Sequence, residues 1–522
     1  MTDISGSKQT SSKSSEIPLS PLSKYAKFLD YIWPIERAEL PKFLSITLLM
    51  FCILSIQNLI RAMKDSVINT MIGVETSSFL KFWGVMPAAI LITIIYVKLV
   101  SVMRGENIFY LMMSSFLGFF LLFAFYLFPN HEMIHLNPET TQALIASYPN
   151  FKWFILLLSN WSFSLFYVIA ELWPSAVFAL LFWQFVNKVT TVEESKRFYP
   201  IFGLLGQTGL YLCGTFLANL LVINTYFTDL FTLEESQSVV SIKIVMILVG
   251  ILGVVALATF WVLNHKILDI STTENLQFRV KKNQITLKES LKIIVQSRYI
   301  RLIATLLVCY GIAINLVEGP WKAGALKVYT TPTEWAAFTG NYLKYTGVLT
   351  VLFTIIGSNL VRRLGWFSAA IITPIMVLVT GLAFFCIANF KFSETLIIMY
   401  FSFSDPVMLA IVIGAMQNVL SKSSKYTLFD STKEMSYVPL DDQLKTRGKA
   451  AADMIGTKLG KSASALLTSL IFVIIPTATY ASISTFLMWI FIGICGVWIW
   501  AVIELNKEYK IACKNKGDET IY

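Results

Sequence analysis

The sequence predicts an all-α membrane protein, and composition, hydropathy and charge placement each support that fold class. Of its 522 residues, 56% are hydrophobic and only 14% are charged, against about 25% charged residues in an ordinary soluble domain. The mean hydropathy is +0.65. The net charge of +10 comes mainly from segments that flank apolar runs, which is typical of membrane topology and not of nucleic-acid binding. We therefore expect a polytopic protein in the lipid bilayer, with no nucleic-acid partner.

Apolar runs long enough to cross a bilayer follow one another along most of the chain. A spanning helix needs about 20 apolar residues. Six suitable runs lie in the first half of the sequence, at 43–63, 79–101, 107–128, 151–188, 199–222 and 241–264. Six more lie in the second half, at 299–318, 336–360, 366–389, 395–420, 450–475 and 482–504. The sequence therefore predicts 12 transmembrane helices.

The run 151–188 is long enough for two helices, and the basic residues of the loops decide how it is counted. The connections 129–150 and 222–240 contain no Lys or Arg, whereas 189–199 and 265–298 are basic. Basic loops remain on the cytoplasmic side. All four connections satisfy this rule only if 151–188 crosses the membrane once, as a long, tilted or broken helix. Pro174 supplies a plausible break because proline interrupts the helical hydrogen bonds.

The predicted helices divide into two bundles of six with both termini in the cytoplasm. The basic segment 421–449 is placed on the same side. The expected parts are a cytoplasmic tail at 1–40 with no cleavable signal peptide, six-helix bundles at 41–264 and 299–505, a cytoplasmic linker at 265–298 and a cytoplasmic tail at 506–522. A faint repeat relates Gln57–Arg61 to Ile314–Glu318. It favours duplicated halves, as in transporters that bind substrate near the membrane midplane between two repeats.

Charged residues within the apolar runs are the candidate functional residues. Each costs about 2.5–3.5 kcal/mol at membrane depth, so such side chains normally face a cavity or the bundle interior. The candidates are Arg61, Lys64 with its neighbour Asp65, Glu171, Glu318, Lys322 and Lys461. Glu171 lies centrally in the run 151–188, with no other charged residue between Lys152 and Lys188. Alternatives remain open for the others: Lys64 and Lys461 as interfacial anchors whose side chains reach the surface, and Glu318 as a loop cap.

The segment GTKLGKS at 456–462 resembles a phosphate-binding loop but lacks its spacing. The Walker pattern requires four residues between the first Gly and the Gly-Lys pair, and only three separate Gly456 from Gly460. The preceding KTRGKAAADMI is helical in character and is not a buried strand. We interpret the two glycines as small residues that let helices approach closely, with Lys461 pointing into a cavity.

Several lysines in one cavity would suit a polyanion, because ammonium groups act as point charges for phosphate oxygens. The sequence thus predicts a secondary transporter for a phosphorylated organic anion. It has no nucleotide-hydrolysing motif, no HExxH or GxSxG and no paired cysteine spacing, so we expect neither a pump, an enzyme nor a metal or other cofactor. A proton-coupled carrier with Glu171 or Glu318 as the proton site is the alternative, and an ion channel remains possible.

Four segments carry a family resemblance: LIRAMKDSVINTMIGVET, VIAELWPSAVFALLFWQFVNKVTTVEESKRFYPIFGLLG, YGIAINLVEGPWK and KYTLFDSTKEMSYVPLDDQLKTRGKAAADMIGTKLGKS. They resemble the ATP/ADP translocase family of obligate intracellular bacteria and plastids, over about residues 30–510. The resemblance implies a major-facilitator-like fold and import of host ATP in exchange for ADP without hydrolysis. The family's functional charges fall on Lys64, Glu171, Glu318 and Lys461, with Lys449 as an alternative for the last.

The expected substrate-binding residues are therefore Lys64, Glu171, Glu318, Lys461, Arg61, Lys449 and Lys322. Near these charges, Trp173, Phe82 and Trp321 are candidates for stacking on the base. Small neighbours of the charges depart from the family pattern, as in Ala463-Ser464-Ala465 after Lys461, so a paralogue that carries GTP, UTP or CTP is also open. We expect a monomer in the bacterial inner membrane.

Overall fold

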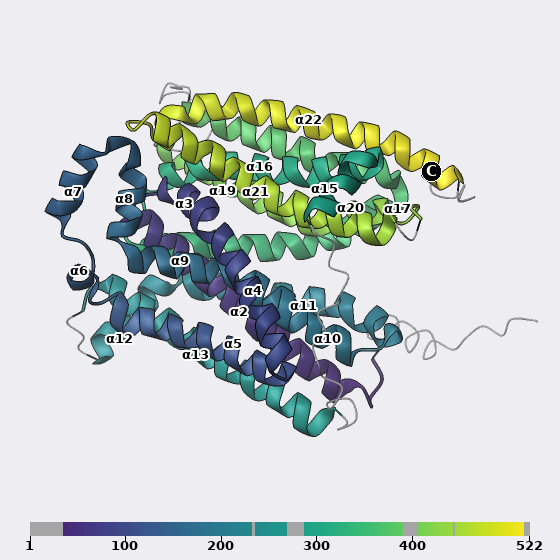
Figure 1. Ribbon diagram of the computed structural model, residues 1–522, viewed down its shortest axis with the longest axis horizontal. Coiled ribbons are helices and arrows are strands. Elements are labelled where there is room, and N and C mark those ends of the chain that lie inside the picture. Colours follow the sequence, from purple (N-terminus) through teal and green to yellow (C-terminus); the bar gives the residue numbers. More distant parts are fainter. Residues whose placement is uncertain (1–34, 232–234, 269–286, 390–404, 442–443, 516–522) are drawn as a thin grey trace, which may run out of the picture.

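The computed structural model describes residues 35–231, 235–268, 287–389, 405–441 and 444–515, and within these ranges the chain is helical with no β-strand (Figure 1). The first half forms α2 (Leu40–Met71), α3 (Thr76–Phe79), η1 (Leu80–Gly84), α4 (Val85–Val102), α5 (Gly105–Leu122), η2 (Phe123–Leu127), α6 (His131–Ile134), α7 (Pro138–Ser147), η3 (Pro149–Phe151), α8 (Lys152–Ser159), α9 (Trp161–Trp173), η4 (Pro174–Phe182), α10 (Trp183–Val189), α11 (Val192–Ala218), α12 (Leu220–Phe231), α13 (Gln237–Val262) and η5 (Leu263–Ile267).

The second half forms α15 (Leu287–Gln296), α16 (Arg298–Ala325), α17 (Pro332–Asn389), α19 (Pro406–Ser424), η6 (Lys425–Phe429), α20 (Asp430–Ser436), η7 (Leu444–Gly448), α21 (Lys449–Ile474) and α22 (Tyr480–Asn515). The η segments are short π-helical turns, except for η3, which is a 3₁₀ turn. The helix α17 is kinked at Gly365, whose φ of 76° suits a residue without a Cβ atom. This kink lies between the predicted runs 336–360 and 366–389.

Nine helices in the described ranges are long and apolar enough to cross a membrane, or ten if one bent pair counts as a single span. That pair, Thr208–Ala218 with Leu220–Thr228, bends by 53°. The first part of α17 and the helix α21 are not among these candidates from the described residues, although both are helical where runs 336–360 and 450–475 were predicted. The all-α prediction is confirmed, and the described residues do not confirm the count of 12.

The long run 151–188 contributes one candidate span, Trp161–Val189, in agreement with the topology argument. The predicted break at Pro174 coincides with the start of the π-helical segment η4. A second interruption at Asn160 separates the short helix α8 from α9. The widened turn after Pro174 accommodates the missing amide donor without ending the span.

Three helices continue past the ends that hydropathy predicts. The helix α2 extends to Met71 instead of 63, and α16 extends to Ala325 through Pro320. The span that begins with α19 reaches Ser436, into the segment that was predicted as a cytoplasmic loop from 421. In each case the extension carries charged residues. These lower the mean hydropathy of the segment, so the predicted helix ends too early. The predicted loop 222–240 is also partly helical, because α12 reaches Phe231.

In Figure 1 the long helices α2, α5, α11 and α13 of the first half lie in the lower part and α16, α21 and α22 of the second half in the upper part, with α7 and α8 of the first half at the left. The halves meet where α11 crosses α17 at two glycines. A Cβ atom on Gly340 would lie 2.3 Å from the backbone nitrogen of Ala218, and one on Gly214 would lie 2.5 Å from that of Lys344. Only residues without a side chain permit this backbone approach between helices.

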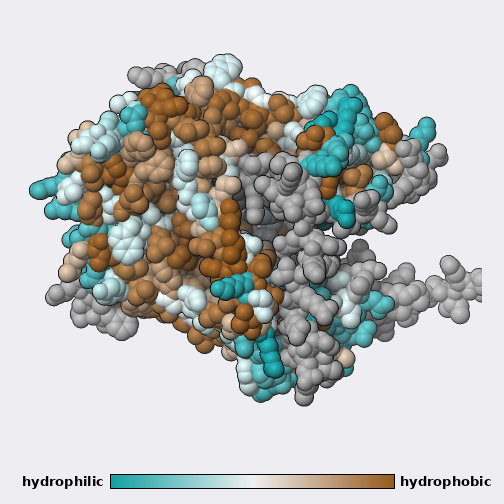
Figure 2. Space-filling model, viewed as in Figure 1, coloured by the Kyte–Doolittle hydropathy of each residue, from teal (hydrophilic) through white to brown (hydrophobic). Residues whose placement is uncertain are grey.

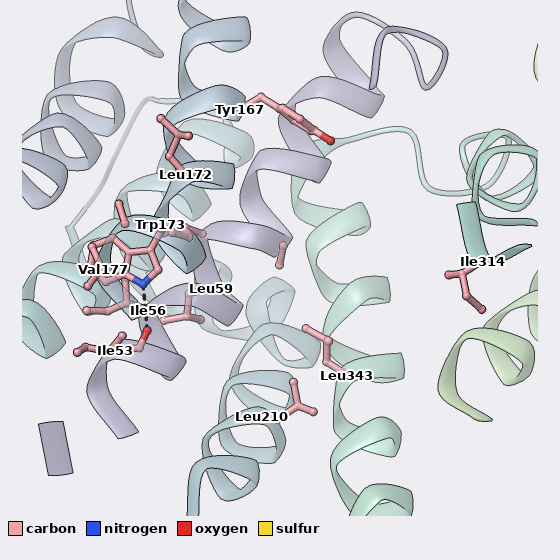
Figure 3. Close-up of a cluster of buried hydrophobic side chains, with 14 of the residues drawn as sticks. Ile53, Ile56, Leu59, Tyr167, Leu172, Trp173, Val177, Leu210, Ile314 and Leu343 are labelled. Atoms are coloured by element: carbon pink, nitrogen blue, oxygen red, sulfur yellow. Dashed lines mark hydrogen bonds between the residues drawn. The ribbon is translucent and has the colours of Figure 1, made fainter. Parts of the chain in front are cut away.

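Apolar side chains cover much of the outer surface (Figure 2). Those of α4 are typical, since Ile90, Leu91 and Ile94 are each more than half exposed. A soluble protein rarely exposes apolar surface this extensively, so the surface is suited to contact with lipid. Inside the first half, α2 packs against α9 and η4 around Ile53, Ile56 and Trp173 (Figure 3).

The segment GTKLGKS lies inside α21, and its glycines pack on α16. A Cβ atom on Gly456 would lie 2.6 Å from Leu307 Cβ, and one on Gly460 would lie 2.9 Å from the carbonyl oxygen of Val308. The interpretation as a close helix contact is confirmed. No phosphate-binding loop is formed here, because the segment continues a helix from Lys449 to Ile474.

Candidate functional site

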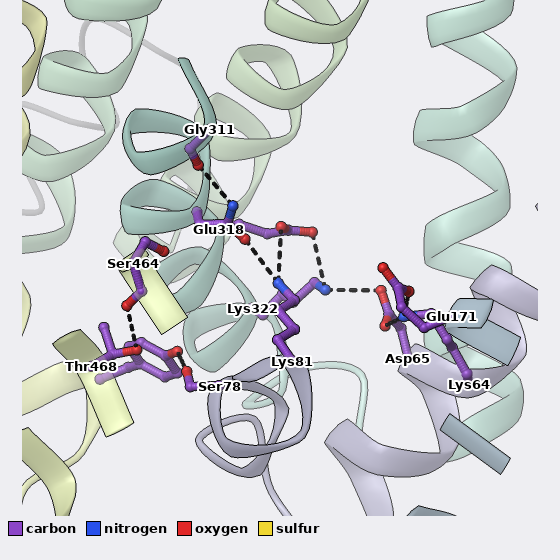
Figure 4. A network of polar contacts seen from close by, with 12 residues as sticks. Lys64, Asp65, Ser78, Lys81, Glu171, Gly311, Glu318, Lys322, Ser464 and Thr468 are labelled. Carbon is purple, nitrogen blue, oxygen red and sulfur yellow. Dashed lines mark hydrogen bonds and ion pairs between the residues drawn. The ribbon is translucent and has the colours of Figure 1, made fainter. Parts of the chain in front are cut away.

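A network of ion pairs joins the two halves of the chain in the interior (Figure 4). Lys64 Nζ lies 2.7 Å from Asp65 Oδ1 and 3.1 Å from Glu171 Oε2. Lys322 Nζ lies 2.9 Å from Asp65 Oδ2 and 3.1 Å from Glu318 Oε1. The carboxylate of Asp65 therefore bridges a lysine of α2 and a lysine of α16.

Helical geometry explains how these side chains come together. Glu318 and Lys322 are four residues apart on α16, so they share one face of the helix. Lys64 and Asp65 are adjacent on α2, and Glu171 approaches them from the neighbouring helix α9. Asp65 and Lys322 are 257 positions apart, the same offset that relates the two sequence segments of the faint repeat.

Further polar groups extend the network. Lys81 of η1 lies 3.7 Å from Glu318 Oε2 and donates a hydrogen bond of 2.9 Å to Asn315 Oδ1. Lys64 Nζ also lies 3.9 Å from the centre of the Tyr167 ring, a cation–π distance. The network thus draws on α2, η1, α9 and α16.

A polar pocket adjoins the network between η1, α16 and α21. Glu318, Lys322, Lys81, Asn315, Ser77, Ser78, Gly319, Ser464, Ala465, Thr468 and Tyr480 line it. The hydroxyl groups of Ser78 and Tyr480 are hydrogen-bonded to each other across the halves. The pocket therefore offers hydroxyl, amide, carboxylate and ammonium groups to a ligand.

The network is buried, which makes its pairing energetically important. The exposed fractions of Lys64 and Lys322 are 3% and 4%. Removing one partner of a buried ion pair costs about 3–5 kcal/mol because the other charge stays desolvated. A ligand phosphate is able to replace a carboxylate as the partner of a lysine without leaving the lysine unpaired. The arrangement suits reversible binding of an anion.

The structure brings four of the seven predicted site residues into one network. Lys64 pairs with Glu171, Lys322 pairs with Glu318, and Asp65 joins the two pairs. The interpretation of Lys64 as an interfacial anchor is wrong, because the side chain is buried in the network. Glu318 is not a loop cap, since α16 continues to Ala325. Both alternatives, the anchor role of Lys64 and the cap role of Glu318, assumed that the helix ends with its apolar run. The helices α2 and α16 instead continue beyond those runs.

The other three predicted residues have different positions. Arg61 lies one turn before Lys64 on α2 and is exposed. Lys449 lies at the start of α21, is 43% exposed in its side chain and pairs with Glu434, so the structure does not bring it into the network. The side chain of Lys461 lies outside the described residues.

Two of the three aromatic residues predicted to stack on a base are buried in the packing. Trp173 is fully buried and its Nε1 donates to the carbonyl oxygen of Ile53 at 3.2 Å. Trp321 is 1% exposed and its Nε1 donates to the carbonyl oxygen of Ile411 at 2.9 Å. Both indoles make structural contacts here. Phe82 is half-buried beside Trp83, and its stacking on a base stays a prediction.

Sequence reasoning missed three charged residues of the site region as binding candidates. Asp65 was noticed only as the neighbour of Lys64, although its carboxylate is the bridge between the halves. Lys81 lies inside the predicted run 79–101, and a charge within an apolar run is a usable signal. Lys422 was assigned to a cytoplasmic loop, whereas it lies within α19.

At the end of the molecule that carries α7 and α8, the halves are joined by polar contacts. The Tyr480 amide donates to Glu75 Oε1 at 3.2 Å, and Asn150 Nδ2 donates to the carbonyl oxygen of Val473 at 2.7 Å. At the opposite end, ion pairs each join residues of a single half: Lys42 with Glu194, Arg197 with Glu39, Lys433 with Asp453 and Arg298 with Glu504. The two halves diverge toward that end (Figures 1 and 2).

The lipid-suited surface and the buried ionic junction between two halves define a polytopic membrane transporter with a major-facilitator-like fold. Solved transporter structures share this fold at low sequence identity. A bacterial homologue of the iron transporter ferroportin superposes with a TM-score of 0.56 and 13% identity, covering 90% of this chain and 98% of that chain. The nucleoside transporter NupG gives a TM-score of 0.52 with 11% identity, covering 90% of this chain and 100% of that chain. A D-xylose-proton symporter gives 0.51 with 12% identity, covering 89% and 97%.

The chain belongs to the TLC ATP/ADP transporter family, whose model matches residues 20–509. It is 66% identical to ADP,ATP carrier protein 4 of Rickettsia bellii, over 94% of each chain. It is 65% identical to ADP,ATP carrier protein 4 of Rickettsia prowazekii, over 94% of this chain and 96% of that protein. Identity to ADP,ATP carrier protein 3 of Rickettsia bellii is 44%, over 95% of this chain and 100% of that protein. The family resemblance seen in the sequence is confirmed.

Proposed function

We propose that this protein exchanges ATP for ADP across the bacterial inner membrane by alternating access, without hydrolysis. The observation that carries the proposal is the cross-half ion network, in which lysines of both halves face one another through carboxylates. A polyanion that enters between the halves competes with those carboxylates for the lysines. Family membership and relatives named ADP,ATP carrier proteins support adenine nucleotides as that polyanion.

In this proposal the lysines Lys64 and Lys322 contact the nucleotide phosphates, with Lys461 as a third contact. Glu171 and Glu318 hold the lysines in position in the empty carrier and release them to the substrate. Lys449, which is exposed and paired with Glu434, has no substrate role. Electrostatics accounts for exchange, because in the empty carrier the Asp65–Lys322 pair joins the halves and opposes reorientation, whereas bound phosphates replace the carboxylates as partners of the lysines.

The proposed architecture comprises two six-helix bundles at about 41–264 and 299–505, joined by a cytoplasmic linker, with both termini in the cytoplasm. The basic residues at the end that carries α10 and α20 support that orientation through the positive-inside rule. The polar contacts at the α7 and α8 end then close the outer side of the carrier, and the conformation is open to the cytoplasm. The site is formed within one chain, so we propose that the monomer is the transporting unit.

The test is uptake of radiolabelled ADP and ATP into liposomes that contain the purified protein. Liposomes preloaded with ADP should take up ATP much faster than unloaded liposomes. Competition by GTP, CTP and UTP should be weaker than competition by ATP, and stronger competition by any of them would reassign the substrate among the nucleotides.

Proton coupling is tested in the same liposomes. Each carboxylate of the network has a lysine partner, so uptake should persist when a proton-conducting agent collapses the pH gradient. Uptake that stops with the agent and ignores internal ADP would contradict exchange. Absence of any nucleotide uptake by the wild-type protein would contradict the proposed substrate class.

A further inference from the structure

The ion network does not by itself supply positive charge for a polyanion. Its members are three lysines and three carboxylates, and each carboxylate lies within 4.0 Å of at least one lysine. The charges of these six side chains therefore cancel. A nucleoside diphosphate or triphosphate needs additional cations, because transfer of its phosphates from water is costly unless charge is compensated.

Two further cations of this region have no carboxylate within 4.0 Å among the described residues. Arg61 is exposed on α2, one turn before the network lysine Lys64. Lys422 is half-buried on α19, in the second half of the chain. Its neighbour on the next turn, Lys425, is by contrast paired with Asp430 at 2.8 Å.

The surroundings of Lys422 place it beside the network. Its ammonium lies 5.0 Å from the centre of the Tyr342 ring. Tyr342 packs edge to face on Trp321 with 5.5 Å between ring centres, and Trp321 precedes the network lysine Lys322 on α16. Arg61 lies one turn before Lys64 on α2, and Lys422 is linked to Lys322 through Tyr342 and Trp321, so the two cations flank the network from opposite halves.

A purely structural role for Lys422 is difficult to satisfy. The helical span continues to Ser436, so the end of the span is about 20 Å away along the axis at 1.5 Å per residue. A cation–π contact at 5.0 Å is a weak substitute for an ion pair. Lys422 therefore lies inside the helical span with no carboxylate within 4.0 Å among the described residues, and its cation–π contact is with the Tyr342 ring.

We propose that Lys422 is a phosphate-binding residue, and that Lys422 and Arg61 hold the phosphate groups of the nucleotide from opposite halves of the carrier. This inference rests on the proposed nucleotide transport and adds a specificity determinant to it. Arginine binds two phosphate oxygens in a planar fork, and lysine provides a point charge for a third. A ligand with a longer phosphate chain reaches both cations, so the pair selects diphosphates and triphosphates over monophosphates.

The test compares Lys422→Gln with the wild type in ADP-loaded liposomes. The variant should raise the KM for ADP and ATP about ten- to hundredfold, the loss expected for a hydrogen bond to a charged group. The inhibition constant of AMP should change much less, so the preference for ADP over AMP should fall. Lys422→Arg should restore most of the affinity, and Arg61→Gln should reproduce the loss of preference.

The matched control is Lys425→Gln, which removes a lysine of the same span that already has a carboxylate partner. It should leave the ratio of ADP to AMP affinity unchanged. Thermal unfolding in detergent verifies that each variant is folded. If Lys422→Gln is folded and its KM values are unchanged, or if AMP is weakened as much as ADP, the inference is wrong. Failure of the wild type to exchange any nucleotide would contradict the proposed function itself, so the two failures are distinguishable.

Discussion

Asp65 is the residue on which the two halves of the site depend. Its two carboxylate oxygens accept from Lys64 and from Lys322, at 2.7 and 2.9 Å. An aspartate side chain is short, so the helices that carry these lysines must approach closely for both contacts to form. The sequence around Asp65 does not indicate that Lys322 of α16 is its partner, because the two residues are 257 positions apart.

Replacement of Lys64 by Gln should slow nucleotide exchange about ten- to hundredfold, since a hydrogen bond to a charged group contributes about 1.5–3 kcal/mol. The change removes a partner of both Asp65 and Glu171. Exchange is measured as ATP uptake into ADP-loaded liposomes. Lys507→Gln is the control, because that side chain is 64% exposed, and equal rates for both variants would refute the role of Lys64.

A double-mutant cycle measures how strongly the bridge couples the halves. Asp65→Asn and Lys322→Gln should each lower the free energy of unfolding by about 3–5 kcal/mol, because each leaves a buried charge with one partner fewer. The double variant should lose less than the sum of the two, by about 0.5–3 kcal/mol. Unfolding of the protein in detergent, followed by circular dichroism, gives the three values. Strict additivity would show that the pair is not coupled.

At the scale of elements, close helix crossings and helix starts determine how the halves are assembled. The crossing of α11 and α17 brings two backbones into contact at Gly214 and Gly340. The start of α11 is fixed by a capping box between Thr191 and Glu194. Glu194 also accepts from Lys42 of α2 at 2.8 Å, which ties the helix start to the neighbouring helix. These contacts depend on residue type at single positions.

Replacement of Gly340 by Ala should separate α11 from α17. A Cβ atom there meets the Ala218 backbone nitrogen at 2.3 Å, and backbone cannot yield as a side chain does. We expect overpacking of about 1–3 kcal/mol in the unfolding free energy together with reduced exchange. Gly324→Ala is the control, because nothing lies within 4 Å of its added Cβ atom. A Gly340→Ala protein as stable and active as the control would contradict this packing.

Glu194 provides a test of pH dependence outside the membrane-spanning segments. Partial burial favours the protonated carboxyl, but hydrogen bonds from Lys42 and from the Thr191 amide outweigh it and hold the pKa of Glu194 below its ordinary value. A lowered pKa stabilises the folded state above the ordinary carboxyl pKa of about 4.3, and this contribution is lost as the pH falls through the folded pKa.

Glu194→Gln should therefore destabilise the protein by about 1 kcal/mol or less near neutral pH, and the difference from wild type should shrink below about pH 4. The measurement is the thermal midpoint of unfolding in detergent at each pH. Glu193→Gln, at an exposed neighbouring position, should show no such pH-dependent difference. A Glu194→Gln effect that is constant with pH would exclude the ion pair as its cause.

At the scale of the whole molecule, contacts between the halves are distributed unevenly. They include the α11 and α17 crossing, the central ion network and the polar contacts at the α7 and α8 end. The ion pairs at the opposite end lie within single halves. A molecule joined at one end and divided at the other is the geometry that rocking of two halves requires.

The sequence alone determined the class of protein, the approximate position of the apolar helices and four members of the ionic site. It could do so because lipid imposes a local requirement of about 20 apolar residues in succession for each span. A charged residue within such a run is therefore easily recognised in the sequence. The separation of runs 336–360 and 366–389, which the kink at Gly365 provides, and the single span at Trp161–Val189 were also predicted, since they depend on local sequence and on loop charge.

Only the tertiary structure decided which charges are paired and where the helices end. Lys64, Asp65 and Lys322 form one bridge although they come from different halves, and no local pattern encodes such a pairing. The span that contains Lys422 likewise continues past its apolar run, to Ser436, which hydropathy did not predict. Hydropathy counts each residue separately, whereas the energy of a buried charge depends on its neighbours in space.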